Sequence, residues 1–250
     1  MTAGPGSGGD QATAFEALVD DYDAARPGYP PALFDALPPL AGQRVLELGA
    51  GTGLQTPGLL ARGAQVVSTD AGPNMLGRLH AKQPALPVAV ARAEALPFAG
   101  ASFAGVCGAQ MWHWVDVPAA VREVTRVLRP GGWLAVWWND VDAAGERWFE
   151  DQQARLEAGG AGYRRSYRTR GYADELAATG AFADVGTWTG TWSRELDAPT
   201  YERWLRSKSY VAALPDPEGF LAAERASLRE AFPDGRIVEP FRVVLVTART

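Results

Sequence analysis

The sequence contains very little cysteine and very little histidine. Its single cysteine, Cys107, excludes an intramolecular disulfide bond and a cysteine-rich zinc site. The two histidines, His80 and His113, are too few for a histidine-rich metal centre. We therefore expect no metal ion in the functional site.

Long hydrophobic runs and an excess of positive charge are also missing. No stretch approaches the ~18 consecutive apolar residues of a membrane helix. With 24 Lys and Arg against 29 Asp and Glu the net charge is -5, and neither nucleic acid nor a membrane surface attracts an acidic protein. Residues 1–10 contain no basic residue and no apolar segment, so they do not resemble a signal peptide. These absences predict a cytoplasmic protein that has no nucleic-acid or membrane partner.

What the chain does contain is a regular alternation of short apolar segments with helix-like segments after residue 41. This alternation is typical of a doubly wound parallel α/β sheet, in which ligands bind at the carboxyl ends of the strands. We expect strands at residues 44–48, 65–69, 88–90, 102–109, 133–138, 185–194 and 241–247. We expect helices after the first strand up to about residue 62 and at 73–83, 118–128, 143–158, 171–179, 199–214 and 217–232.

A glycine-rich loop, GAGTG at residues 49–53, follows the first strand. Glycines permit a tight turn with positive φ and close approach of a ligand to the backbone. The spacing Gly-x-Gly-x-x-Gly of a dinucleotide site fails from Gly49 and from Gly51, and no phosphate-binding Gly-Lys-Ser/Thr follows. Glu47 beside the loop would repel a pyrophosphate but suits a ligand that carries a positively charged amine. A glycine-rich turn without any ligand is the alternative.

An acidic residue, Asp70, ends the second strand. A carboxylate at this place can accept hydrogen bonds from both hydroxyls of a ribose. Alternatively, Asp70 is the N-cap of the helix that starts at Pro73. The loop and Asp70 together indicate a nucleoside ligand that is not a dinucleotide.

Four segments resemble the successive motifs of class I S-adenosylmethionine-dependent methyltransferases. They are VLELGAGTG at 45–53, STDAGPNML at 68–76, AEALPF at 93–98 and LRPGGW at 128–133, in the order and spacing of that family over roughly residues 40 to 140. YDAARPGYP at 22–30 and QMWHWVD at 110–116 are similar to its small-molecule branch, the type 11 and trans-aconitate methyltransferase-like proteins.

This resemblance implies a fold and a domain organisation. The fold is a Rossmann-like, doubly wound α/β sheet of seven strands, mostly parallel with the last strand antiparallel, with helical cap insertions. We expect a disordered leader at 1–14, an N-terminal segment at 15–40 that folds over the cofactor, and the cofactor-binding core at 41–140. Substrate cap helices and the closing strands of the same sheet occupy 141–250.

The resemblance also implies an activity and a cofactor. The expected reaction transfers a methyl group from S-adenosyl-L-methionine to oxygen, nitrogen or carbon of a small molecule, such as a secondary metabolite or a carboxylate. S-adenosyl-L-homocysteine is the product, and the protein is a monomer or a weak homodimer. Two alternatives remain: a cyclase or isomerase of the same fold without methyl transfer, and a cofactor-binding protein without turnover.

The residues that match the family motifs are the expected cofactor contacts. They are Glu47, Gly49, Ala50 and Gly51 at the methionine portion, Asp70 at the ribose, Ala71 and Met75 at the adenosine, Ala93 and Glu94 at the adenine edge, and Gln110 at the amine or sulfonium. Many relatives have an acid before the Ala-Glu pair, whereas this chain has Arg92, so we expect a backbone contact at Ala93.

The N-terminal segment offers Tyr22 and Arg26 as further cofactor contacts. Arg26 could form two parallel hydrogen bonds with the methionine carboxylate. Alternatively, Arg26 is structural or solvated, and Tyr22 and Tyr29 pin this segment to the body of the protein.

His113 and a group of aromatic residues are the candidates for catalysis and acceptor binding. An unperturbed histidine pKa near 6.5 suits a general base, although His113 could equally shape the cofactor pocket by packing. Aromatic faces can contact a sulfonium or stack on an apolar acceptor, while ordinary packing is the alternative for each ring. The acceptor candidates are Trp112, Trp114, Trp192, Trp204 and Tyr210.

Overall fold

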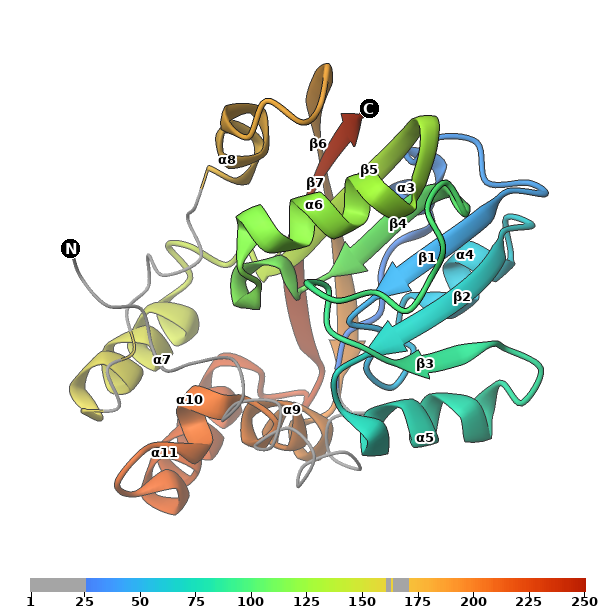
Figure 1. The fold of residues 1–250 in the computed structure, drawn as a ribbon. Helices are drawn as coiled ribbons and strands as arrows, with labels where there is room; N and C mark the ends of the chain where they lie inside the picture. Colours follow the sequence, from blue (N-terminus) through green and yellow to red (C-terminus); the bar gives the residue numbers. More distant parts are fainter. Residues whose placement is uncertain (1–25, 161–162, 164–170) are drawn as a thin grey trace.

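The computed structural model describes residues 26–160, 163 and 171–250, and these form one seven-stranded sheet (Figure 1). The spatial order is β3-β2-β1-β4-β5-β7-β6. The strands are β1 Arg44–Leu48, β2 Gln65–Asp70, β3 Val88–Val90, β4 Phe103–Ala109, β5 Leu128–Val141, β6 Asp184–Leu196 and β7 Ile237–Arg249. β7 pairs antiparallel with both β5 and β6, and the other strands run parallel. The predicted fold class is therefore confirmed.

Helices cover both faces of the sheet and its carboxyl edge. The helices are α3 Pro31–Asp35, α4 Thr56–Leu60, α5 Pro73–Lys82, the 3-10 helix η1 Trp112–Trp114, α6 Val117–Val127, α7 Arg147–Ala158, α8 Tyr172–Ala178, α9 Ala198–Arg206, α10 Ser209–Ala212 and α11 Pro217–Ala231. In Figure 1 the arrows of β1, β2 and β4 point toward the side on which α7, α9, α10 and α11 gather. None of the described helices is long and apolar enough to cross a membrane.

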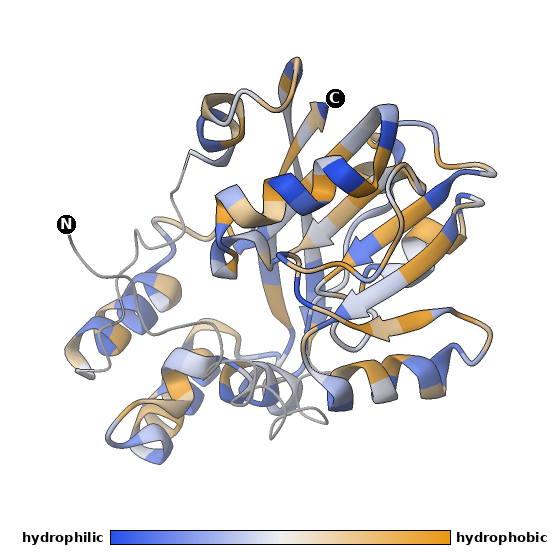
Figure 2. Ribbon diagram, viewed as in Figure 1, coloured by the Kyte–Doolittle hydropathy of each residue, from blue (hydrophilic) through white to orange (hydrophobic). Residues whose placement is uncertain are grey.

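Three groups of buried apolar side chains stabilise this arrangement. One lies between the sheet and α6 with α8, and a second lies on the opposite face with α3, α4 and α5. The third joins α7, α9, α10 and α11, so these cap helices have a core of their own. Figure 2 shows hydrophobic residues along the central strands, while α6 carries hydrophilic and hydrophobic residues in alternation. Trp133, Trp137 and Trp138 lie in the core, since each is at most 4% exposed.

The helix expected at 199–214 is in fact two helices, α9 and α10. The Ser207 hydroxyl donates to the Trp204 carbonyl at 2.6 Å, and Arg26 donates to the Ser207 carbonyl at 2.8 Å. These contacts occupy carbonyls that a continuous helix would use, so the chain turns at Ser207 and Lys208. The prediction of one helix was wrong because a residue 181 positions away takes part in ending it.

Other boundaries differ by a few residues. Strand β5 extends beyond the predicted 133–138 in both directions, because Leu128 pairs with Phe103 of β4 and Val141 pairs with Phe241 of β7. Helix α7 begins at Arg147 rather than at 143, because Gly145 adopts a φ of +88° and Glu146 N donates to Ala143 O in a turn. The predicted leader at 1–14 and Tyr22 lie outside the described residues.

Two glycines give a direct test of the packing between β4 and β5. A Cβ at Gly105 would lie 2.1 Å from the Trp133 ring, whereas a Cβ at Gly77 on α5 would meet nothing within 4 Å. Gly105→Ala should therefore lower the free energy of unfolding by about 1–3 kcal/mol through overpacking. Gly77→Ala should raise it by up to about 1 kcal/mol because alanine favours a helix. Urea unfolding of both variants checks this, and equal effects would contradict the packing of Trp133 against Gly105.

Candidate active site

The candidate site is built from loops that follow β1, β2, β4 and β5. These strands are parallel neighbours, so their carboxyl ends meet at one edge of the sheet. The glycine loop at 49–53, Asp70, Gln110 and Asn139 therefore lie along the same edge although they are far apart in the sequence.

The glycine loop has the backbone conformation that its sequence predicts. Gly49, Gly51 and Gly53 have φ values of +58°, +55° and +87°, in the left-handed region that favours glycine. A Cβ at Gly49 would lie 2.8 Å from two side-chain atoms of Met111, whereas a Cβ at Gly51 would meet no atom of the described residues within 4 Å. The loop is thus packed against Met111 on one side and leaves room for a close ligand at Gly51.

Asp70 fixes this loop from the end of β2. Its Oδ2 accepts a hydrogen bond from Gly51 N, and its Oδ1 accepts one from Gly72 N, each at 2.8 Å. A carboxylate has about four acceptor positions, two on each oxygen. The N-cap of α5 is Gly72, and no side chain caps this helix, so the alternative role of Asp70 as N-cap does not hold.

Glu47 lies beneath the loop and is fully buried. Its carboxylate accepts hydrogen bonds from Ser68 Oγ at 2.5 Å and from Thr56 Oγ1 at 2.9 and 3.0 Å. Burial raises the pKa of Glu47 to about 7, although the two hydroxyls oppose this shift. Glu47 thereby ties β1 to β2 and to the start of α4, and its role at the methionine portion stays a prediction.

A backbone conformation rare for a side chain other than glycine marks the end of β4. Gln110 has a φ of +55°, and such conformations cluster at functional sites. Its backbone N donates to Trp137 O at 2.9 Å, and its Nε2 donates to Asn139 O at 2.9 Å. Gln110 is thus held on the end of β5, at the edge where the cofactor contact was predicted.

Asn139 joins three parts of the chain and was missed in the sequence. It is 5% exposed; its Nδ2 donates to Gly28 O at 3.2 Å, and its Oδ1 accepts from Trp192 Nε1 at 2.9 Å. These bonds fasten the N-terminal segment and β6 to the end of β5. The signal that could have found it is an amide directly after the apolar run 133–138.

Arg26 connects the N-terminal segment to the cap. Its Nε donates to Ser207 Oγ at 3.1 Å and its Nη2 donates to Ser207 O at 2.8 Å, at the end of α9. Tyr29 packs edge-on against Trp137 with the ring centroids 6.0 Å apart. These two hydrogen bonds support the structural alternative for Arg26, and its pairing with a carboxylate stays a prediction.

The predicted adenosine contacts lie around the ends of β2 and β3. Met75 and Ala93 are buried, while Ala71 is exposed. Glu94 Oε1 accepts from Asp116 N at 2.9 Å, so this side chain links the loop after β3 to the start of α6. The exposed Arg92 lies 3.6 Å from the Glu94 carboxylate.

His113 lies in η1 and contacts Trp138. The Trp138 indole N–H donates to His113 Nδ1 at 3.4 Å, a long hydrogen bond. With Nδ1 as acceptor, the neutral ring carries its hydrogen on Nε2. Trp138 also stacks on Tyr172 at a centroid distance of 3.7 Å, so the indole that contacts His113 is held firmly.

The structure separates the predicted acceptor residues into two groups. Trp112 and Trp204 are 1% and 3% exposed, and packing accounts for both. Trp114, Trp192 and Tyr210 are half-buried. Their role with the acceptor stays a prediction. Within the described residues, no group of three or more His, Cys, Asp or Glu side chains could hold a metal ion.

Comparisons with known proteins relate this chain to methyltransferases. Residues 46–136 match the family model described as Methyltransferase domain. An uncharacterized methyltransferase of Mycobacterium tuberculosis is 46% identical over 133 residues, which are 53% of this chain and 55% of the relative. The match thus spans about half the length of the curated relatives.

Solved structures extend the likeness to the whole fold. A proposed type II methyltransferase from Anaeromyxobacter dehalogenans has a TM-score of 0.69 and 25% identity, covering 90% of this chain and 97% of that chain. Residues 46–136 form a class I S-adenosylmethionine-dependent methyltransferase domain. A Haemonchus contortus phosphoethanolamine N-methyltransferase 2, solved with S-adenosylhomocysteine and phosphomonomethylethanolamine, shares the fold of this methyltransferase domain. Its TM-score is 0.56 at 18% identity, over 96% of this chain and 58% of that chain.

The raised pKa of Glu47 predicts a pH-dependent stability of the methyltransferase domain. The native state holds the proton more tightly than the unfolded chain, with a pKa of about 7 against 4.5. The protonation of Glu47 therefore contributes on the order of 3 kcal/mol to the free energy of unfolding. This contribution is complete below the unfolded pKa of Glu47 and is lost as the pH rises through 7. Glu47→Gln removes the ionisation. The free energy of unfolding of the wild type should therefore fall relative to Glu47→Gln between pH 5 and pH 8.5 in urea titrations. Parallel pH dependences of the two proteins would contradict the assignment.

Proposed function

We propose that this protein transfers a methyl group from S-adenosylmethionine to a small-molecule acceptor. The observation that carries the proposal is the pair formed by Gly51 and Asp70: Gly51 is a left-handed glycine beside which the described residues leave open space, and its amide donates to the Asp70 carboxylate. This arrangement suits a nucleoside whose ribose lies on Asp70. The methyltransferase domain supports the proposal, because S-adenosylmethionine is the cofactor of that family.

The remaining cofactor contacts are assigned to the same carboxyl edge of the sheet. We assign the methionine portion to Gly49, Ala50 and Gly51, with Glu47 beneath them. The adenine edge lies at Ala93 and Glu94, with Ala71 and Met75 beside the adenosine, and Gln110 approaches the amine or the sulfonium. Arg26 and Tyr22 are proposed to complete the site from the N-terminal segment.

Catalysis rests mainly on alignment of the acceptor with the cofactor. When bound, S-adenosylmethionine supplies a sulfonium methyl group, which passes to the acceptor while the sulfur keeps the bonding electron pair. Holding two reactants in line can lower a barrier by ~7–11 kcal/mol. The rigid strand ends at Asp70 and Gln110 suit this task, because hydrogen bonds fix both backbones.

His113 is the proposed base where the acceptor is a hydroxyl. When Nδ1 takes a proton from the acceptor, it no longer accepts the long hydrogen bond from the Trp138 indole. Protonation of His113 therefore costs only a weak hydrogen bond. Trp114, Trp192 and Tyr210 are half-buried aromatic residues that suit an apolar or aromatic acceptor. The acidic net charge supports a small molecule rather than nucleic acid as acceptor, and the single cysteine suits the cytoplasm. We further propose a monomer or a weak homodimer.

The first experiment is calorimetric titration with S-adenosylhomocysteine, with NAD as control. We expect micromolar binding of S-adenosylhomocysteine alone. Small acceptors are then incubated with S-adenosylmethionine and analysed by mass for the gain of one methyl group. Folded protein that binds neither ligand contradicts the proposal. Binding together with a product of unchanged mass favours the cyclase or isomerase alternative.

Substitution of Asp70 tests the ribose contact. Asp70→Ala removes a charged acceptor, and its loss should weaken S-adenosylhomocysteine binding by roughly 100-fold or more. Asp35→Ala is the matched control, because Asp35 is an exposed aspartate that pairs with Arg62 away from this edge. Equal affinities of the two variants by calorimetry would exclude Asp70 from the site.

Substitution of His113 separates binding from turnover. His113→Ala should bind S-adenosylhomocysteine as the wild type does, and should lose at least about 100-fold in methyl transfer to a hydroxyl acceptor. Turnover is followed by mass spectrometry at saturating cofactor. Unchanged turnover would remove His113 as the base.

A further inference from the structure

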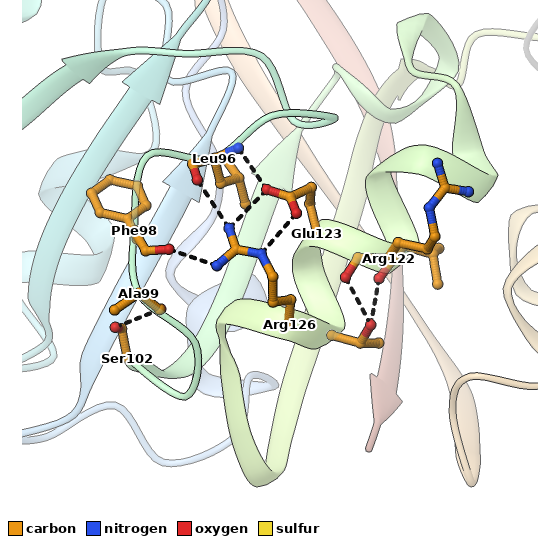
Figure 3. Close-up of polar contacts among 9 residues, drawn as sticks. Leu96, Phe98, Ala99, Ser102, Arg122, Glu123 and Arg126 are labelled. Carbon is orange, nitrogen blue, oxygen red and sulfur yellow. Dashed lines mark hydrogen bonds and ion pairs between the residues drawn. The ribbon is translucent and has the colours of Figure 1, made fainter.

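Two charged residues of α6 hold the loop that follows β3 (Figure 3). Arg126 donates from Nη1 to Phe98 O at 2.7 Å and from Nη2 to Leu96 O at 3.0 Å. Glu123 Oε2 accepts from Leu96 N at 2.8 Å. The two side chains also bind each other, with Arg126 Nε 2.8 Å from Glu123 Oε1. We call Glu123 and Arg126 the α6 clasp.

The clasp binds backbone atoms and not side chains of the loop. Its ion pair lies at the surface, where such pairs contribute little to stability. Arg126 holds the pKa of Glu123 at about 2, so the clasp stays charged at any working pH. The clasp thereby fixes three backbone groups, which belong to two loop residues. Its main effect is on the path of the loop rather than on the stability of the fold.

The loop is anchored at both ends as well. Ala91 N donates to Asp70 O at 2.9 Å, so the loop starts beside the proposed ribose contact. Glu94 Oε1 accepts from Asp116 N at the start of α6. Leu96 is buried in the core, and Phe98 packs edge-on against Phe103 at 5.1 Å. The peptide at Ala93 and Glu94 thus lies between fixed points next to Asp70.

We propose that Glu123 and Arg126 are positioning residues that set the peptide at Ala93 and Glu94 to recognise the base of the cofactor. This inference rests on the proposed function. The loop starts beside Asp70, so a base attached to a ribose there would lie next to it, and each loop residue offers one backbone donor and one backbone acceptor. Adenine presents an acceptor at N1 and a donor at its amino group, whereas hypoxanthine presents the reverse. A peptide held in place therefore accepts adenine and rejects hypoxanthine.

The test compares two ligands that differ only at this edge, S-adenosylhomocysteine and S-inosylhomocysteine. Calorimetry gives the ratio of their affinities for the wild type, Glu123→Gln and Arg126→Met. We expect the wild type to favour the adenosyl ligand. In the variants this ratio should fall about 3- to 10-fold, the effect of one misplaced hydrogen bond. Arg236→Met is the control, because Arg236 forms an exposed ion pair with Glu195 outside the loop.

The ratio distinguishes positioning from a loss of folded protein. Partial unfolding lowers both affinities by the same factor and leaves the ratio unchanged. Glu123→Gln keeps an acceptor for Leu96 N, so a folded variant is available where Arg126→Met fails to fold. An unchanged ratio in folded Glu123→Gln and Arg126→Met overturns the inference while the proposed function stands. A wild type that binds neither ligand overturns the proposed function itself.

Discussion

The hydrogen bond between Gly51 N and Asp70 is the interaction on which the candidate site depends. It joins the loop after β1 to the end of β2, and three left-handed glycines make this close approach possible. Met111 fills the other side of the loop, against Gly49 and Gly108. The surface that faces a ligand is therefore backbone, held by a carboxylate and supported by a side chain from the loop after β4. Any residue other than glycine would strain this left-handed backbone, so glycine is needed at these positions.

Glu47, the buried acid beneath the loop, is subject to two opposing effects. Burial of Glu47 disfavours its charged form, while Ser68 and Thr56 donate hydrogen bonds that favour it. Asp70 nearby adds a second negative charge and raises the pKa of Glu47 further. A polar group so deeply placed is tolerated because its partners come from β2 and α4, the two elements that must be aligned for the loop to form. Fold and site thus share one small network.

Local patterns predicted the core of the fold, and they failed where distant residues meet. The strand ends, the glycine loop and Asp70 could be recognised because each depends on neighbours in the sequence. Asn139 could not be assigned a role, since its partners Gly28 and Trp192 lie 111 and 53 positions away. The break between α9 and α10 and the α6 clasp have the same origin, because Arg26 and Arg126 act on backbone carbonyls of other segments. Every residue has a backbone carbonyl, so the sequence does not indicate which carbonyls accept these hydrogen bonds.

The cap helices, which are proposed to bind the acceptor, are stabilised differently from the strand ends that are proposed to bind the cofactor. Helices α7, α9, α10 and α11 bury their apolar residues against one another, and Trp204 contributes its ring to that core, with Lys208 Nζ 4.1 Å from the ring centroid. An aromatic residue in a cap therefore serves packing as readily as ligand binding, and composition alone cannot distinguish the two. Arg26 binds Ser207 and so ties the N-terminal segment to the cap, while Asn139 binds Gly28 O and Trp192 and so ties that segment and β6 to the end of β5. Because the cap has its own core, its lining residues can change while the strand ends that are proposed to hold the cofactor stay fixed. A fold divided in this way keeps one cofactor site and accommodates different acceptors.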